Sequence, residues 1–292
     1  MKAKAIYLLS ALLALSLTIN VTCRTALQDS KPLPPKERLK AATTTSLYDT
    51  GLWSYLEPLF EEKFGVELDV LYAGTGIALE YGRRGDVDVI TVHSKAREEE
   101  FVAEGYGVER VPFAYNYFLI VGPKDDPAQL KGMSPEDAFK RLAQEGKWAF
   151  ISRGDDSGTH SKEKEVWRSA GFSEEDIQSF GHWYIEAGRG MGPTLLMANE
   201  LKAYTLSDLG TFLSYKGKLE LVPLVEKGKI LLNVYSAIAV NPERNPKVNF
   251  KMASKLIEFL TSPEIQELIG SYGREEYGRP LFIPCAGAEP ES

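Results

Sequence analysis

The sequence predicts an α/β protein with mixed, largely parallel sheets, because short apolar segments alternate along the chain with segments of helical periodicity. Residues 67–72 place alternate apolar side chains on one face, which is typical of a strand with one buried side. Residues 86–92 and the longer apolar run 111–121 are the next two expected strands. Helical patterns lie between these strands, and this alternation favours largely parallel pairing.

Two of the expected helices have clear end signals. Residues 52–60 carry leucines and a phenylalanine at helical spacing. Asp49 or Thr50 is the candidate N-cap of this helix, and Gly65 is its candidate stop. The segment Ser134-Pro-Glu-Asp137 predicts another helix start, with serine as the cap, proline at the first position and acids in the first turn.

Length and charge bound the possible functions. The 292 residues are enough for two domains. The composition, with 43% hydrophobic and 26% charged residues, is ordinary for a globular protein and allows a sizeable core. The formal net charge of -7 argues against nucleic acid as a partner, because such binding needs a basic surface. It does not argue against an anionic ligand, which local donors can hold. With 3 His and 2 Cys, a zinc cluster is not expected.

The N-terminus predicts export across the cytoplasmic membrane. Two lysines precede the apolar run 6–19, which is shorter than the ~20 residues that a spanning helix needs. We therefore expect residues 1–23 to be a signal peptide, with a membrane anchor as the alternative. Cys23 stands where lipoproteins carry an acylated cysteine, but the residues before it fit that pattern poorly, so periplasmic and lipid-tethered forms both stay open. Residues 24–38, rich in proline and charge, predict a tether or a plain tail.

Two similar segments suggest where the chain could cross between two lobes. Residues 117–123 and 235–242 are each an apolar strand closed by a proline turn. If both lie at crossovers, residues 39–116 and 233–292 form lobe one, and residues 117–232 form lobe two. Coincidence between two ordinary strand-turn units is the alternative.

Hydroxyl and glycine residues gather where predicted strands end and helices begin. Thr43-Thr-Thr-Ser46 fits a helix N-terminus, where side-chain oxygens meet free backbone N–H groups and a positive dipole. Such an end is an anion site or a plain capping turn. Ala73-Gly-Thr-Gly76 and the glycine turn of residues 188–194 occupy similar positions, and glycine allows close approach of a ligand to the backbone. Arg189 in the latter turn could serve a ligand or face solvent.

The segment Ser152-Arg-Gly-Asp-Asp-Ser-Gly-Thr-His160 gives the strongest signal. A strand, a Gly/Ser/Thr turn and a helix together form a geometry that cradles an oxyanion. Arg153 adds planar donors and a permanent charge, unless it pairs with Asp155 or Asp156 on the surface. The candidate ligand-binding residues of all these segments are Thr44, Thr45, Ser46, Thr75, Arg153, Ser157, Gly158 and Thr159, with weaker support for His93, Gly192 and Thr194.

Nothing in the sequence predicts strong catalysis. The Gly-x-Ser-x-Gly nucleophile elbow is absent. Ser157 and His160 lie on one predicted turn, but a triad also needs an oriented third group and a pocket for the scissile bond. A secreted hydrolase that uses these two residues is therefore kept only as a third alternative.

Three segments together carry a family resemblance: the TTTS segment (residues 43–46), the SRGDDSGTH loop (residues 152–160) and the GMGPT turn (residues 190–194). With them, the sequence closely resembles the tungstate-binding proteins of bacterial and archaeal ABC transporters. The resemblance extends from Leu39 to Pro284. It implies the type II-like, two-lobed fold of periplasmic binding proteins with two crossovers, a monomer, and an ABC transporter permease as partner. The family's arginine matches Arg153, while Thr75 matches only by its general position after the second strand. Cys285 departs from the family's pattern, so no role is transferred to the extreme C-terminus.

The ligand that the resemblance implies, tungstate or molybdate, sets a chemical expectation for the cleft between the lobes. Tungstate is a doubly charged tetrahedron with four acceptor oxygens and no proton at neutral pH, so its site should consist of donors. A phosphate site gains from an acceptor for the phosphate proton, and Asp155 and Asp156 keep phosphate open. Binding of phosphate or another oxyanion is therefore the second alternative. Capture of such an anion breaks no bond and needs no cofactor, so the chain is expected to be a binding protein and not an enzyme.

Overall fold

The computed structural model describes residues 37–290. The predicted signal peptide, Cys23 and nearly all of the predicted tether lie outside these residues. The tether was expected to reach residue 38, whereas the first strand already begins at Glu37. None of the helices within the described residues is long and apolar enough to cross a membrane.

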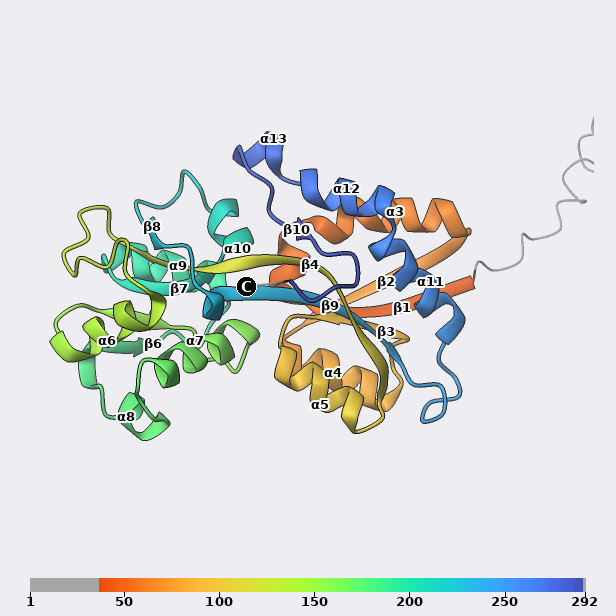
Figure 1. Cartoon of the computed structure of the whole chain (residues 1–292), viewed down its shortest axis with the longest axis horizontal. Helices are drawn as coiled ribbons and strands as arrows, with labels where there is room; N and C mark the ends of the chain where they lie inside the picture. Colours follow the sequence, from red (N-terminus) through yellow and green to blue (C-terminus); the bar gives the residue numbers. More distant parts are fainter. Residues whose placement is uncertain (1–36, 291–292) are drawn as a thin grey trace, which may run out of the picture. The chain divides into compact units, whose positions relative to one another are not determined.

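Ten strands form one mixed sheet in the part of the chain that the structure describes (Figure 1). They are β1 Glu37–Thr44, β2 Val66–Ala73, β3 Val89–Val92, β4 Gly107–Gly122, β5 Phe150–Ser152, β6 Tyr184–Glu186, β7 Tyr204–Asp208, β8 Val222–Val225, β9 Leu232–Val240 and β10 Ile283–Pro284. The order is β2-β1-β3-β9-β4-β7-β5-β6, and β8 and β10 also pair with β4. The three strands expected from the sequence correspond to β2, β3 and β4.

Helices surround both halves of this sheet. They are α2 Thr45–Asp49, α3 Leu52–Phe64, α4 Thr75–Arg84, α5 Lys95–Ala103, α6 Pro135–Glu145, α7 Gly158–Ser169, α8 Glu174–Gln178, α9 Met191–Glu200, α10 Leu209–Ser214, α11 Phe250–Thr261, α12 Pro263–Ser271 and α13 Arg274–Tyr277. Figure 1 shows α6 to α9 around one half, and α3, α4, α5, α11 and α12 around the other.

The long strands β4 and β9 connect the two halves. β4 pairs with β9 as far as Tyr117 and then with β7 from Phe118 onward. Parallel ladders lie on either side, between β1 and β3 and between β5 and its neighbours β6 and β7. The α/β class and the mixed sheet are confirmed, but the centre is less parallel than expected, because all four partners of β4 run antiparallel to it. The exact lobe boundaries stay a prediction.

Two of the predicted helix end signals are confirmed, Ser134 and Gly65, and Gly65 is the C-cap of α3. The predicted N-cap of α3, Asp49 or Thr50, is wrong, because Gly51 has that place. Ser134 caps α6, and its hydroxyl accepts the N–H of Asp137 at 3.1 Å, as the sequence predicts. The helix after the TTTS segment is interrupted: α2 ends at Asp49 and α3 begins after Gly51. Gly51 has φ 77, a left-handed conformation that glycine adopts without strain, so it allows this break.

An aromatic core fixes α7, the helix after the SRGDDSGTH loop. Trp167 of α7 is fully buried, and its ring lies 4.3 Å from that of Phe139 in α6 and 5.4 Å from that of Phe150 in β5. Burial of one such side chain contributes about 1.5–3 kcal/mol. The N-terminus of α7 is therefore held in a defined position relative to β5.

Candidate functional site

One cavity of about 660 Å³ collects ten of the eleven candidate residues. The predicted residues that line it are Thr44, Thr45, Ser46, Thr75, His93, Arg153, Ser157, Gly158, Thr159 and Gly192. They come from loops far apart in the sequence, which the sheet brings together. Gathering in one cavity is what a binding site requires, although it does not by itself identify the ligand.

Three helices of ten residues or more begin at this cavity. The N-caps of α4, α7 and α9 are Gly74, Ser157 and Gly190, and all three residues line it. The first backbone N–H groups of a helix have no partner inside the helix, and the dipole makes that end positive. The cavity wall therefore combines three positive helix ends with hydroxyl groups.

The TTTS segment lies beside His93 in the wall. The Thr44 hydroxyl accepts the N–H of Leu47 at 3.3 Å and lies 3.3 Å from the Ser46 hydroxyl. The Ser46 hydroxyl in turn forms a hydrogen bond with His93 Nε2 at 3.1 Å. His93, a weaker candidate in the sequence, thus orients a hydroxyl that lines the cavity.

Both histidines near the cavity favour the neutral form. Burial lowers the pKa of His93 to about 4; the Asn233 side chain opposes the shift, and the positive charge of Arg153 adds to it. Burial, followed by the charge of Lys164, lowers the pKa of His160 as well. The His93 ring therefore stays neutral between pH 6 and 8, and the shift of His160 is in the same direction.

Anion affinity is consequently expected to change less than about twofold between pH 6.5 and 8, because arginine and hydroxyl groups do not titrate there either. Calorimetric titrations at several pH values test this expectation. A steep fall of affinity with rising pH, following one proton, would show that a charged histidine holds the ligand.

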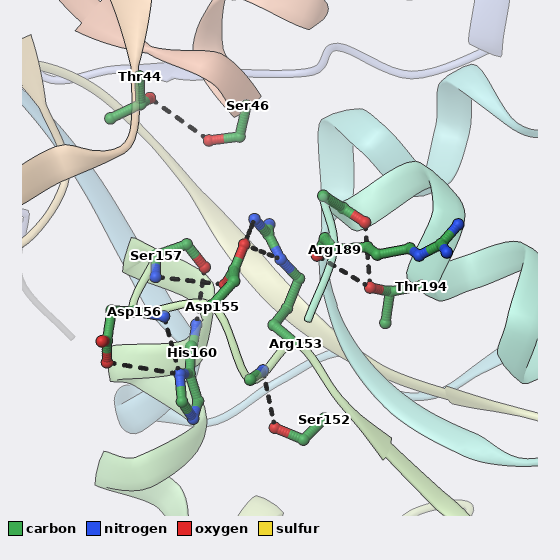
Figure 2. Close-up of polar contacts among 12 residues, drawn as sticks. Thr44, Ser46, Ser152, Arg153, Asp155, Asp156, Ser157, His160, Arg189 and Thr194 are labelled. Carbon is green, nitrogen blue, oxygen red and sulfur yellow. Dashed lines mark hydrogen bonds and ion pairs between the residues drawn. The ribbon is translucent and has the colours of Figure 1, made fainter. Parts of the chain in front are cut away.

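Arg153 is held by a neighbouring carboxylate (Figure 2). Asp155 Oδ2 accepts from Nε of Arg153 at 3.1 Å and also from Nη2. The expected alternative of an Arg153–Asp155 pair is therefore present, but it lies in the cavity wall and not on the open surface, since the Arg153 side chain is only 10% exposed. Asp156 is 87% exposed and lies beside His160 and Lys164, outside the cavity lining.

Gly158 brings two walls of the cavity close together. A Cβ atom at this position would lie 2.8 Å from His93 Cε1 and 3.3 Å from the Thr75 hydroxyl. The Thr75 hydroxyl is buried and has no hydrogen-bond partner among residues 37–290. A buried hydroxyl without a partner is costly unless a ligand or water satisfies it. The structure therefore supports Thr75 as a ligand-binding residue independently of the family resemblance, which matched it only by its position.

Two residues of the glycine turn 188–194 lie away from the cavity. The Thr194 hydroxyl donates to the carbonyls of Gly190 at 3.0 Å and Arg189 at 3.3 Å, and Thr194 is fully buried outside the lining. The prediction that Thr194 binds the ligand is therefore wrong. Its hydroxyl instead stabilises the first turn of α9. Arg189 is exposed, and Figure 2 shows its side chain pointing away from Arg153.

The cavity also contains residues that the sequence did not indicate. Asp49 lies in the lining, so the expected wall of donors alone is not what the structure has. Burial raises the pKa of Asp49, and the charge of Arg153 opposes that shift. Thr211, Ser214 and Tyr215 enter from α10 and its end. No sequence signal indicated these three residues. The structure brings α10 against the glycine turn, where a Cβ on Gly192 would lie 2.2 Å from the Tyr215 hydroxyl.

Comparison with known proteins shows the family of the chain. A family model described as a PBP superfamily domain matches residues 30–264. The tungstate-binding protein TupA of Peptoclostridium acidaminophilum is 46% identical over 94% of this chain and 95% of its own length. The chain belongs to the TupA family of the PBP superfamily. TupA of Campylobacter jejuni is 40% identical over 80% of this chain and 86% of its own length.

Solved structures support the same membership of the TupA family. The tungstate-binding protein TupA from Desulfovibrio alaskensis is 40% identical with a TM-score of 0.77, over 86% of this chain and 99% of that one. A protein from Geobacter sulfurreducens, described as a tungstate ABC transporter, is 50% identical with a TM-score of 0.72. The match covers 81% of this chain and 99% of that one. The predicted two-lobed binding-protein fold and the resemblance to the family are confirmed.

Proposed function

We propose that this protein is the extracytoplasmic solute-binding component of an ABC importer, and that it captures tungstate, with molybdate as the nearest competitor. The relatives described as tungstate-binding cover nearly the whole chain, which supports this assignment. The ligand would lie in the cavity lined by the TTTS segment, Thr75, Arg153 and residues 157–159.

The observation that best supports an oxyanion is the convergence of donors on one cavity. Three helix N-termini, the Arg153 guanidinium and the unpartnered Thr75 hydroxyl all border it. An ion whose four oxygens only accept hydrogen bonds satisfies such a wall. The donors come from segments on both sides of the cavity, so the ion would hold these segments together.

Phosphate matches the cavity less well than tungstate does. A protonated phosphate gains from a carboxylate that accepts its proton, but Asp156 lies outside the cavity, and both oxygens of Asp155 already accept hydrogen bonds from Arg153 and Ser157. Asp49 is the remaining carboxylate in the lining. Direct competition between the anions decides this point.

The arrangement of Ser157 and His160 argues against the hydrolase alternative. The Ser157 hydroxyl accepts the backbone N–H of His160 at 3.2 Å, which is a helix cap. His160 Nδ1 accepts the N–H of Asp156 at 3.1 Å instead of facing the serine. The relatives are binding proteins, and the role proposed for this chain is likewise not enzymatic.

Release of the ligand requires the walls of the cavity to separate. Gly158 lies against Thr75 and His93, and a Cβ on Gly210 would lie 2.6 Å from the Thr50 methyl group. These close approaches describe a closed arrangement, and hinge opening would expose the ion to a permease. We propose that the protein acts as a monomer outside the cytoplasmic membrane, and that Cys23 is the place to test for lipid attachment.

Tungstate is expected to raise the melting temperature of the protein. A ligand that binds only the folded state adds RT ln(1 + [L]/Kd) to stability, ~4 kcal/mol at a thousandfold excess over Kd. Thermal unfolding with and without saturating tungstate measures this effect, and chloride at the same ionic strength is the control. A melting temperature that does not move with tungstate or molybdate would rule out the proposed function.

A further inference from the structure

The carboxylate of Asp155 has an unexpected place in a cavity proposed to hold a dianion. Its Oδ2 accepts from Nε and Nη2 of Arg153, and its Oδ1 accepts the N–H of Ser157 at 3.2 Å. The side chain is 21% exposed, so it belongs to the wall of the cavity. One carboxylate therefore connects the guanidinium to the N-cap of α7.

We propose, on the basis of the proposed anion-binding function, that Asp155 is a positioning residue that fixes Arg153 and the N-terminus of α7 in one arrangement for the ligand. Asp155 uses the guanidinium edge formed by Nε and Nη2. The edge that carries Nη1 is left for the anion. Arg153 is thus oriented before the ligand arrives, which reduces the rotamer freedom lost on binding.

Other carboxylates near Arg153 do not hold it in the same way. The charge of Arg153 influences both Asp49 and Asp208. Asp208 Oδ1, however, accepts the N–H of Thr211 at 2.8 Å and caps α10. Among residues 37–290, the hydrogen bonds of the Arg153 side chain go to Asp155. The orientation of the guanidinium therefore depends on Asp155.

This role makes a prediction opposite to that of simple charge repulsion. If Asp155 only repelled the ligand, its neutralisation would strengthen anion binding, because like charges close together repel. If it positions Arg153, its neutralisation releases the guanidinium and weakens binding. The sign of the change in affinity therefore separates the two accounts.

The test is calorimetric titration with tungstate of the wild type, Asp155→Asn and Asp156→Asn. Asp155→Asn keeps the size of the side chain and one acceptor for the Ser157 N–H, and it is expected to weaken binding by about 10-fold, the scale of a lost charge-assisted hydrogen bond. Asp156→Asn removes the same charge one residue away, outside the cavity, and is expected to leave affinity within about twofold, as exposed charges do. Equal or tighter binding by Asp155→Asn would overturn the proposal.

A double-mutant cycle with Arg153→Ala shows whether Asp155 acts through the guanidinium. In the Arg153→Ala background, Asp155→Asn is expected to change tungstate affinity less than about twofold. An equally large loss in that background would mean a direct contact or a folding defect, and would also overturn the positioning role. Failure of the wild type to bind tungstate would instead remove the proposed function itself.

Discussion

Replacing Arg153 with alanine is expected to weaken tungstate binding by about 10- to 100-fold. Arg153 is the only Lys or Arg in the cavity lining of the described chain, and its side chain is largely buried. A hydrogen bond from a charged donor contributes about 1.5–3 kcal/mol, and 1.4 kcal/mol corresponds to a factor of ten. Arg153→Lys should restore part of the affinity, because an ammonium group cannot reproduce the planar fork.

Arg189→Ala is the matched control for Arg153→Ala. It removes the same charged group from a glycine turn that borders the cavity, but the Arg189 side chain is exposed and outside the lining. We expect nearly wild-type affinity for this variant in the same titration, and unchanged melting of this variant without ligand. A loss of affinity in Arg189→Ala with none in Arg153→Ala would place the anion at the turn near residue 190.

Replacing Gly158 with alanine is expected to cause a loss of similar size. The new Cβ would lie 2.8 Å from the buried His93 ring, closer than side chains tolerate. Overpacking of this kind costs about 1–3 kcal/mol, and here the cost falls on the closed arrangement that holds the ligand. Tungstate affinity should therefore fall by about 5- to 100-fold.

Gly76→Ala is a suitable control for Gly158→Ala. Its Cβ would make an ordinary 3.7 Å contact with Arg97 Nη1, and the residue lies in the first turn of α4 outside the cavity lining. Affinity should stay near that of the wild type. If Gly158→Ala bound tungstate as tightly as Gly76→Ala, the close approach of α7 to Thr75 and His93 would not be needed for binding.

The candidate site could be predicted mainly where its residues belong to local strand-to-helix junctions. The TTTS segment and the SRGDDSGTH loop combine hydroxyl, glycine and arginine residues at helix starts, and such segments have a physical meaning without the rest of the fold. The Arg153–Asp155 pair was foreseen only as a surface alternative. The pair lies in a cavity wall because segments distant in the sequence pack opposite it. A local sequence pattern carries no information about those segments.

The remainder of the site depends on tertiary contacts. Thr211, Ser214 and Tyr215 lie at α10, a helix of six residues whose sequence shows no anion-binding pattern. Thr194 looked like a ligand-binding residue, but its hydroxyl has a local carbonyl partner in the first turn of α9. The sequence identifies candidate hydroxyl groups, but only the folded structure shows which groups they bind.

The fold shows the same division between local and long-range information. Alternation of strands and helices predicted the α/β class, and the Ser134 cap predicted the start of α6. The antiparallel centre was not foreseen, because pairing of β4 with β9 joins residues more than one hundred positions apart, such as Tyr117 and Leu232. Apolar runs of this length indicate burial but not strand direction.

The most direct test of the proposed function is a calorimetric titration of the purified protein with tungstate, followed by competition with molybdate, phosphate and sulfate. A cavity with one arginine and three helix N-termini should bind one tungstate per chain. We expect phosphate and sulfate to compete much more weakly. The absence of binding heat with tungstate, or displacement of tungstate by an equal concentration of phosphate, would contradict the assignment.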